Sequence, residues 1–309
     1  LERFDILSSK YAGGAEILKE TFRLKDQGNR ELGLRYDLTV PMCRYIAMNP
    51  TIKMPFKRYQ IGEVFRDGPV ASARYRQFTQ CDVDVVGSSS MASDAEIISL
   101  IYMAFCKFNM EVIIRVNSRK LLNNILDYCG IEKGRQEAVI LSIDKLEKLG
   151  INVVRNELKE QKIDDKKIST ILDVVNIKGG NQQKISQLKK LLKDSEGLNE
   201  IGQLLIYLKN LNFEAEFDVS MARGLAYYTG TVIEAFLRGG SIKSAVCGGG
   251  RYDSMIGGFL GKGNYPAVGV SFGVDRIYDA LTEKQETKKK TNTQVYIIPI
   301  KTLNESMKI

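Results

Sequence analysis

The sequence predicts an α+β protein in which an antiparallel sheet domain is interrupted by a helical insertion. Two changes of pattern along the 309 residues indicate this. Residues 1–116 mix alternating, β-like stretches with helical ones, residues 117–212 are helical and heavily charged, and residues 213–282 return to glycine and β-forming side chains. Strands and helices that are kept apart along the chain are typical of α+β domains.

The clearest strand signal in residues 1–116 is a long hairpin. Residues 56–66 (FKRYQIGEVFR) and 74–86 are rich in β-formers, and the loop between them contains Gly68-Pro69, a turn signal. Arg66 stands where the first strand meets this loop. Its planar guanidinium suits phosphate and carboxylate, which it binds through two parallel hydrogen bonds.

The second strand of this hairpin has two different faces, because alternate side chains of a strand share a face. One face is mostly core-like: Tyr75, Gln77, Thr79, Cys81, Val83 and Val85. The other has cations at one end and carboxylates at the other: Arg74, Arg76, Phe78, Gln80, Asp82 and Asp84. This polarity fits ATP beside an amino acid. The alternative is an exposed face with cross-strand ion pairs.

The helical character of residues 117–212 follows from apolar residues that recur three or four positions apart, the pattern of amphipathic helices. The clearest example is the series Ile185, Leu188, Leu191, Leu192, Leu198, Ile201, Leu204 and Leu205.

Two glycine-rich segments follow. Residues 222–230 combine Arg223 with Tyr227 and Tyr228 ahead of a strand, and adjacent tyrosines in a strand would point to opposite faces. The three consecutive glycines at 248–250 allow either a ligand to approach the backbone closely or a tight bend. Neither segment is a phosphate-binding loop of the Walker or Rossmann type, since no G-K-[ST] or helix-opening G-x-G-x-x-G is present.

Residues 267–281 read as a buried strand, a glycine turn and a helix. Arg276 falls in the first turn of that helix, where the helix dipole disfavours a cation. This placement indicates a function, and an ordinary surface arginine is the alternative.

The last part of the chain predicts a linker and a new domain. Residues 283–292 are charged and include Lys288, Lys289 and Lys290, which favour an exposed hinge over an RNA contact. Residues 293–300 then read as a buried strand, so residues 293–309 are expected to begin another domain.

Composition excludes several functions. Histidine is absent, which removes every mechanism that needs a histidine base or metal ligand from this chain. The formal net charge of +8 permits a polyanionic partner such as RNA. Five scattered cysteines without a C-x-x-C pair support neither a zinc site nor a disulfide framework, so a reducing, cytoplasmic location is expected. No apolar run reaches membrane-spanning length, and no membrane partner is expected.

Five segments, in this order along residues 1–281, together resemble the class II histidyl-tRNA synthetases. They are Leu34–Pro41, Arg58–Gly87 (motif 2), Arg223–Gly230, Gly249–Asp253 and Gly269–Arg276 (motif 3). The resemblance implies a class II antiparallel sheet flanked by helices, and a ligase that makes histidyl-adenylate and pyrophosphate from histidine and ATP before charging tRNA(His). It also implies Mg²⁺, a homodimer, and residues 293–309 as the truncated start of an α/β anticodon-binding domain. Motif 1 is absent from its expected upstream place.

The same resemblance assigns roles to individual residues. The α-amino group of histidine would be held by Asp37, Thr39 and Gln80. The imidazole nitrogens would be bound by Asp84 and Tyr228, in a pocket lined by Tyr227 and Tyr252.

For ATP, the resemblance places Arg66 and Arg223 at the α-phosphate as the catalytic residues, with Arg66 also at the substrate carboxylate. Arg74 would lie toward the γ-phosphate and Glu63 at the adenine edge, with the adenine ring between Phe78 and Arg276. No general base is needed for this chemistry, because the attacking carboxylate is already ionised at neutral pH.

One position departs from the family pattern, because Ala226 stands where the family usually has aspartate. We expect a local packing change there. Two non-charging relatives share the fold and remain alternatives: the regulatory subunit of ATP phosphoribosyltransferase and a regulatory domain of a stress kinase. Both predict loss of the ATP-binding arginines, which this sequence retains.

Overall fold

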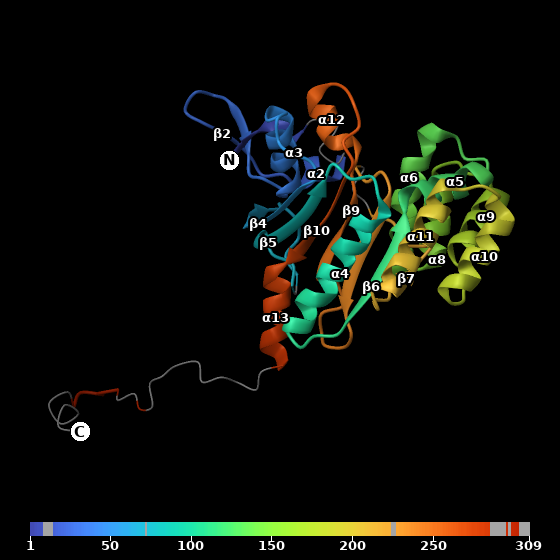
Figure 1. The fold of residues 1–309 in the computed structure, drawn as a ribbon. Coiled ribbons are helices and arrows are strands. Elements are labelled where there is room, and N and C mark those ends of the chain that lie inside the picture. The colour runs from blue at the N-terminus through green and yellow to red at the C-terminus, as the bar shows by residue number, and fades with distance from the viewer. Residues whose placement is uncertain (9–14, 72, 224–226, 285–294, 296–297, 303–309) are drawn as a thin grey trace.

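The computed structural model describes residues 1–8, 15–71, 73–223, 227–284, 295 and 298–302 (Figure 1). Its centre is a sheet of seven strands in the order β4-β5-β10-β9-β8-β6-β7. Every neighbouring pair is antiparallel except β6 and β7. The strands are β4 (Phe56–Phe65), β5 (Gln77–Val86), β6 (Val112–Ser118), β7 (Glu216–Phe217), β8 (Thr231–Leu237), β9 (Cys247–Arg251) and β10 (Ala267–Gly273). The predicted α+β class is confirmed.

The predicted hairpin is formed by β4 and β5, whose register runs from Phe56 opposite Val86 to Phe65 opposite Gln77. The second strand begins at Gln77 and not at Arg74 as expected. Ala73 has a φ of 54°, a left-handed conformation that a strand cannot continue, and Arg74 makes only an isolated bridge with Ala71. The cationic end of the predicted strand therefore belongs to the hairpin loop.

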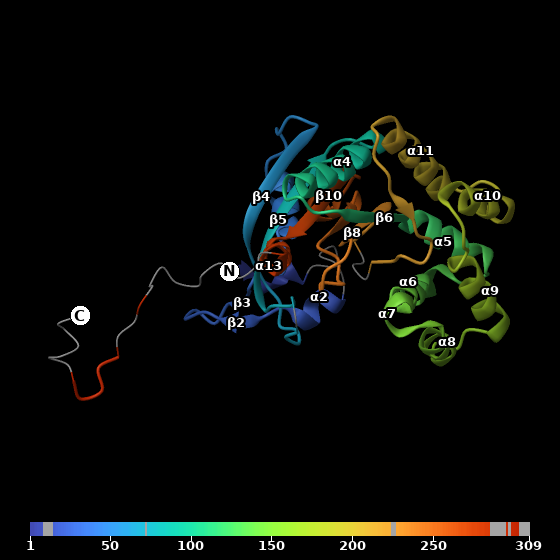
Figure 2. The same ribbon diagram turned by 90° about the horizontal axis from the view of Figure 1, so that it is seen from below.

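Two helices cover one face of this sheet: α4 (Met91–Lys107) and α11 (Glu196–Asn210) (Figure 2). The side chains of Cys81, Val83 and Val85 pack into the core formed with these helices. Because β5 alternates, Gln80, Asp82 and Asp84 point to the opposite face. The side of β5 that was expected to be core-like is therefore the one under the helices.

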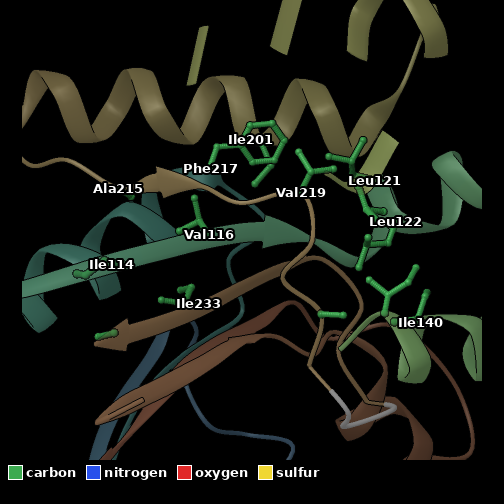
Figure 3. Close-up of a cluster of buried hydrophobic side chains, with 14 of the residues drawn as sticks. Ile114, Val116, Leu121, Leu122, Ile140, Ile201, Ala215, Phe217, Val219 and Ile233 are labelled. Carbon is green, nitrogen blue, oxygen red and sulfur yellow. The ribbon is translucent and has the colours of Figure 1, made fainter. Parts of the chain in front are cut away.

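The helices of residues 119–210 begin directly after β6 and end shortly before β7. Figure 3 shows the buried side chains where they meet the sheet, with Ile114, Val116 and Ile233 of the strands opposite Ile201 of α11 and Leu121. Besides α11, these helices are α5 (Arg119–Tyr128), α6 (Lys133–Ile143), α7 (Leu146–Leu149), α8 (Ile151–Glu160), α9 (Asp165–Val175) and α10 (Asn181–Leu192).

A smaller layer lies beside β4, at the upper end of the molecule in Figure 1. A three-stranded sheet has the order β1-β3-β2, and α3 packs on α12 over a separate core that contains Met42, Cys43 and Ile256. The elements are β1 (Glu2–Arg3), α1 (Phe4–Leu7), α2 (Ala15–Glu20), β2 (Arg23–Lys25), β3 (Glu31–Gly33), α3 (Thr39–Met48) and α12 (Ser254–Leu260).

The chain leaves the sheet through α13 (Val274–Lys284), which follows β10 directly and places Arg276 in its first turn as predicted. The expected linker starts at residue 283, but residues 283 and 284 still belong to this helix, and residues 285–292 lie outside the described part. The expected buried strand at 293–300 is not formed by its described residues. Val295, Ile298 and Ile300 are 75%, 69% and 77% exposed, since no described strand pairs with this segment.

In the described part of the chain, no helix combines the length and apolar character that crossing a bilayer requires.

Candidate active site

A pocket lies on the sheet face opposite α4, where β5, β10 and β9 run side by side. Arg66 and Arg223 line it, and so does every side chain expected to bind histidine: Asp37, Thr39, Gln80, Asp84, Tyr227, Tyr228 and Tyr252. These residues lie up to 215 positions apart in the chain, from Asp37 to Tyr252, and the antiparallel order of the strands brings them together.

The polar face of β5 forms one wall of this pocket. Gln80, Asp82 and Asp84 alternate along the strand and are only 8%, 2% and 2% exposed. The alternative of an exposed sheet face is therefore wrong for these three residues, although its cross-strand ion pairing is present, since Arg58 of β4 pairs with Asp82 and Asp84. Burying carboxylates costs free energy unless they are paired, so their presence here indicates a site that receives a polar ligand.

Asp84 is held by groups from two other elements. Its Oδ1 accepts a hydrogen bond of 2.5 Å from the Tyr252 hydroxyl, and its Oδ2 lies 2.9 Å from Nη2 of Arg58. Asp84 also needs Gly269 as its neighbour on β10, because a Cβ built there would lie 2.7 Å from the carboxyl carbon. The carboxylate is thus fixed on three sides before any ligand enters.

The opposite part of the pocket offers acceptors without partners. Asp37 Oδ1 accepts from the backbone N–H of Val40 at 3.0 Å and so helps to start α3. Among the described residues, Asp37 Oδ2 and Gln80 Oε1 are buried and have no hydrogen-bond partner. Two such acceptors at one place suit a donor with several protons, such as an ammonium group.

Asp82 lies between these acceptors and Asp84. Its Oδ2 accepts a hydrogen bond of 3.4 Å from Thr39 Oγ1 and lies 3.9 Å from Arg58 Nη2. Burial, with the nearby charge of Asp84 adding to it, raises the pKa of Asp82 to about 7. Burial also raises the pKa values of Asp37 and Asp84, although Arg58 acts in the opposite direction on Asp84.

Arg223 enters the pocket over the glycine strand β9. A Cβ built on Gly248 would lie 2.9 Å from Cζ of Arg223 and would overlap its Nη1. The interpretation of the triple glycine as a tight bend is wrong, since residues 247–251 form a strand. The side chain that approaches the backbone at Gly248 is that of Arg223, and the close approach of a ligand stays a prediction. The guanidinium also donates to the Ile233 carbonyl at 3.1 Å and lies 3.5 Å from Glu234, which fixes its direction.

Both tyrosines of the 222–230 segment line the pocket, whereas adjacent tyrosines of a strand would point to opposite faces. They precede β8 and do not lie in a strand, so the alternation rule does not apply. Their ring centroids are 4.8 Å apart, and Arg223 lies 5.6 Å from the ring centroid of Tyr228. Ala226 lies outside the described residues.

Arg66 continues β4 into the hairpin loop and lies between two aromatic rings. Its Cζ is 4.2 Å from the ring centroid of Tyr36 and 5.1 Å from that of Phe78. Cation–π contacts of this kind restrain a guanidinium without using its N–H donors. The Nε of Arg66 also donates to the Tyr36 carbonyl at 3.5 Å, and its terminal N–H groups remain available to an anion in the pocket.

The other residues expected to bind ATP lie outside the lining of this pocket and gather at the hairpin loop. Arg74 forms an ion pair of 2.9 Å with Glu20, and Glu63 accepts a hydrogen bond of 2.9 Å from Gln77. Arg276 donates to the carbonyls of Ala73 and Ala245, both at 2.8 Å, and so ties α13 to the loop. The ring centroid of Phe78 lies 5.1 Å from Cζ of Arg66, which lines the pocket.

Two residues that received no individual role from the sequence, Asp82 and Arg58, lie among the residues expected to bind histidine. Asp82 had a detectable signal, because it lies between Gln80 and Asp84 on the same face of one strand. Arg58 had no detectable signal in the sequence, since its role depends on the strand register that sets it opposite Asp84.

Comparison with known proteins places this geometry in a family. A family model described as Histidyl-tRNA synthetase matches residues 1–277. The chain is 47% identical, over its whole length, to a relative named Histidine--tRNA ligase 1 from Bacillus cereus, of which it covers 73%. The chain belongs to the histidyl-tRNA synthetase family. The family resemblance predicted from the sequence is confirmed, and with it the enzyme class, since this is a family of class II aminoacyl-tRNA ligases.

Solved structures agree with this assignment. The crystal structure of histidyl-tRNA synthetase from Nostoc sp. has a TM-score of 0.77 at 32% identity; the match covers 91% of this chain and 66% of that one. A structure titled ATP phosphoribosyltransferase regulatory subunit/histidyl-tRNA synthetase, from Bacillus halodurans, has a TM-score of 0.72 at 24% identity and covers 85% of this chain and 68% of that one. The second likeness shows the shared fold alone.

Proposed function

We propose that this chain carries the site at which histidine reacts with ATP to give histidyl-adenylate and pyrophosphate, after which the histidyl group passes to the 3′ end of tRNA(His). One observation carries the proposal: a single pocket is lined by two arginines, Arg66 and Arg223, and by a row of buried carboxylates along β5. A ligand with phosphate and carboxylate at one end, and ammonium and imidazole at the other, matches that polarity.

In this proposal the amino acid lies along β5. Its α-ammonium group donates to Asp37 Oδ2 and Gln80 Oε1, two of the buried acceptors without a hydrogen-bond partner, with Thr39 also in the pocket lining. Its imidazole donates to Asp84 and to the hydroxyl of Tyr228. A competitor without ring N–H groups would leave these buried acceptors unpaired and would be rejected strongly. The rings of Tyr227 and Tyr252 complete the walls.

The phosphate end is proposed to lie at Arg66 and Arg223. The carboxylate of histidine attacks the α-phosphorus, the bond to pyrophosphate breaks, and no proton has to be removed. What the step needs is in-line placement and cations on the phosphoryl oxygens, which two preorganised guanidinium groups supply. Adenine is proposed to lie between Phe78 and Arg276, near Glu63, with Arg74 toward the γ-phosphate.

Magnesium belongs to this proposal as an ion carried with ATP. In the described part of the chain, no group of three or more histidine, cysteine, aspartate or glutamate side chains is placed to hold a metal. Mg²⁺ usually keeps several waters and is bound through one or two carboxylates together with substrate phosphates, so such a cluster is not required. The ion would add positive charge at the phosphoryl oxygens.

A homodimer, a tRNA partner and a cytoplasmic location complete the proposal. Tyr59 and Ile61 are 76% and 63% exposed on β4, an edge strand of the sheet, which favours a protein contact there. The formal net charge of +8 suits tRNA. All five cysteines are free thiols, as a reducing compartment would maintain them.

The test is histidine-dependent exchange of pyrophosphate into ATP, measured on the full-length protein that contains this chain. We expect exchange with histidine and none with phenylalanine. Arg223→Ala should lower the exchange rate at saturation by about 100-fold, as for loss of one preorganised donor, while histidine binding is retained. Arg238→Ala removes an arginine that is 66% exposed and should change neither quantity. Histidine binding without any exchange by the unmodified protein would instead support the regulatory-subunit alternative.

A further inference from the structure

The amino-acid end of the pocket has an excess of buried carboxylates. Asp37, Asp82 and Asp84 are 7%, 2% and 2% exposed, and all three line the same pocket. Within the described residues, Arg58 is the cation that forms ion pairs with Asp82 and Asp84. Like charges in a buried site raise one another's pKa, so three carboxylates cannot all stay ionised without such a partner.

Arg58 connects the parts of the pocket that bind different ends of the substrate. Its side chain is 10% exposed and its Nη2 lies 2.9 Å from Asp84 Oδ2 on β5. The same nitrogen donates to the Leu38 carbonyl at 3.2 Å, directly between Asp37 and Thr39. Its other terminal nitrogen donates to Gln60, which lies opposite Asp82 in the register of the hairpin.

From this geometry, and on the basis of the function proposed above, we propose that Arg58 is a positioning residue for recognition of the imidazole ring. Its guanidinium keeps Asp84 ionised and fixed in direction, and it offsets Asp82 so that both carboxylates can share the pocket. Arg58 need not touch the substrate for this. It holds Asp84, which binds the imidazole, and it holds the Leu38 carbonyl between Asp37 and Thr39, which bind the α-amino group.

The ionised form of Asp84 is what recognition needs. The Tyr252 hydroxyl already donates to Oδ1, and a ring N–H has to find a second acceptor lone pair on the same carboxylate. A protonated carboxyl group would present an O–H toward one of its neighbours and lose that acceptor. Without Arg58, burial and the charge of Asp37 would both act to protonate Asp84, since both raise its pKa. The mutual repulsion between Asp84 and Asp82 acts in the same direction.

The charged and titratable groups that face Asp84 come from every element packed around it. They are Arg58 from β4, Asp82 from β5 itself, Asp37 from the turn before α3, Cys43 from α3 and Tyr252 after β9. Arg58 is the single cation in this described set. Removing its charge should therefore make histidine binding depend on pH in a defined direction, with affinity recovering as pH rises and Asp84 ionises.

The experiment compares Arg58→Met, Asp82→Asn and the double variant in the exchange assay, with KM for histidine and for ATP measured from pH 6 to pH 9. We expect Arg58→Met to raise the histidine KM by about ten-fold or more at neutral pH, with ATP KM changed less than about three-fold. The effect should shrink toward high pH. Adding Asp82→Asn should restore a large part of the lost affinity, because it removes the carboxylate that Arg58 had offset.

Lys57→Met is the matched control, since it removes the neighbouring cation of β4, whose partner is Glu96 on the other face and whose side chain is 54% exposed. It should leave both KM values unchanged. Arg58→Lys serves if Arg58→Met does not fold. It keeps the charge but loses the fork that reaches both Asp84 and Leu38, and we expect a rise in histidine KM of about three-fold or more.

Three results would overturn the role of Arg58: equal rises of both KM values, no recovery in the double variant, or an unchanged histidine KM in Arg58→Lys and Arg58→Met. Calorimetric titration of histidine into each variant makes the test independent of catalysis. Failure of the unmodified protein to exchange pyrophosphate would contradict the proposed function alone, whereas an active protein indifferent to Arg58 would contradict this inference alone.

Discussion

The guanidinium of Arg223 occupies the space above Gly248 that a side chain would fill. A Cβ at this position would lie 2.9 Å from Cζ and 3.1 Å from Nη2, and would overlap Nη1. The neighbouring bonds of Arg223 to Ile233 and Glu234 leave it little room to move aside. The position of the Arg223 guanidinium therefore depends on the absence of a side chain at Gly248 of β9.

We expect Gly248→Ala to displace Arg223 and to lower the rate of pyrophosphate exchange at saturation by about 100-fold, close to the effect of Arg223→Ala. Circular dichroism and thermal unfolding would establish that the sheet is retained. Gly202→Ala is the control, because a Cβ there meets nothing within 4 Å on α11. That variant should keep full activity and gain about 0.5 kcal/mol in stability. Normal exchange by Gly248→Ala would show that Arg223 is not needed in this position.

A second glycine tests the other end of the pocket. In Gly269→Ala the new Cβ would lie 2.7 Å from the carboxyl carbon of Asp84 and 2.8 Å from the carbonyl oxygen of the neighbouring Val83, and would push the carboxylate away from Tyr252. We expect the KM for histidine to rise by about ten-fold or more, while the KM for ATP changes little.

Gly273→Ala, at the end of the same strand, is the matched control, since its nearest neighbours would lie at an ordinary 3.6 Å. It should leave the histidine KM unchanged. Equal effects of the two substitutions on the histidine KM would mean that β10 as a whole, and not Asp84, is being disturbed.

The alternation of β5 shows what sequence could predict about this site. A period of two placed Gln80, Asp82 and Asp84 on one face, and a strand in a sheet keeps that relation whatever surrounds it. The core-like side chains on the other face also indicated which face the helices cover, since Cys81, Val83 and Val85 pack into the core beneath them. The pattern did not contain how deeply the polar face is buried. The carboxylates turned out to be the more buried side chains, because a pocket and not solvent lies beyond them.

The side-chain contacts between neighbouring strands could not be predicted from the sequence. Arg58 looks like any arginine on a hairpin, and its contact with Asp84 follows from a register that only the folded sheet defines. In a strand Tyr227 and Tyr228 would point apart, whereas the chain reaches β8 only at Thr231 and both rings line the pocket. A boundary shifted by a few residues therefore decided whether one or two rings enter the site.

The buried pair of Arg251 and Asp94 predicts a large stability effect away from the pocket wall. Arg251 precedes Tyr252, its side chain is 3% exposed, and it pairs with Asp94 of α4, which is fully buried. Asp94→Asn would leave a buried guanidinium short of its counter-charge and should lower the free energy of unfolding by about 3 kcal/mol. Glu111→Gln breaks a pair that is 66% and 80% exposed, and should cost less than about 0.5 kcal/mol in urea unfolding. Similar losses for both variants would contradict this interpretation.

The raised pKa of Asp82 predicts how stability depends on pH. Burial and the charge of Asp84 raise its pKa from 3.8 to about 7, so between these values the folded protein holds a proton that the unfolded chain has released. The stabilisation from this proton is complete below the unfolded pKa and is lost as pH rises through about 7. Asp82→Asn removes the titration, so its free energy of unfolding relative to the unmodified protein should increase between pH 5 and pH 8.5. Each pKa unit corresponds to about 1.4 kcal/mol, so we expect this relative free energy of unfolding to change by roughly 2 to 3 kcal/mol between the two pH values.

Urea unfolding of both proteins at the two pH values measures this difference. Asp67→Asn is the control, since Asp67 lies in the hairpin loop with its side chain 48% exposed. Its stability should follow that of the unmodified protein at both pH values. A constant offset between Asp82→Asn and the unmodified protein would show that Asp82 is ionised throughout this range. In that case the pocket would hold its full negative charge before histidine arrives, and Arg58 with the substrate ammonium group would have to balance it.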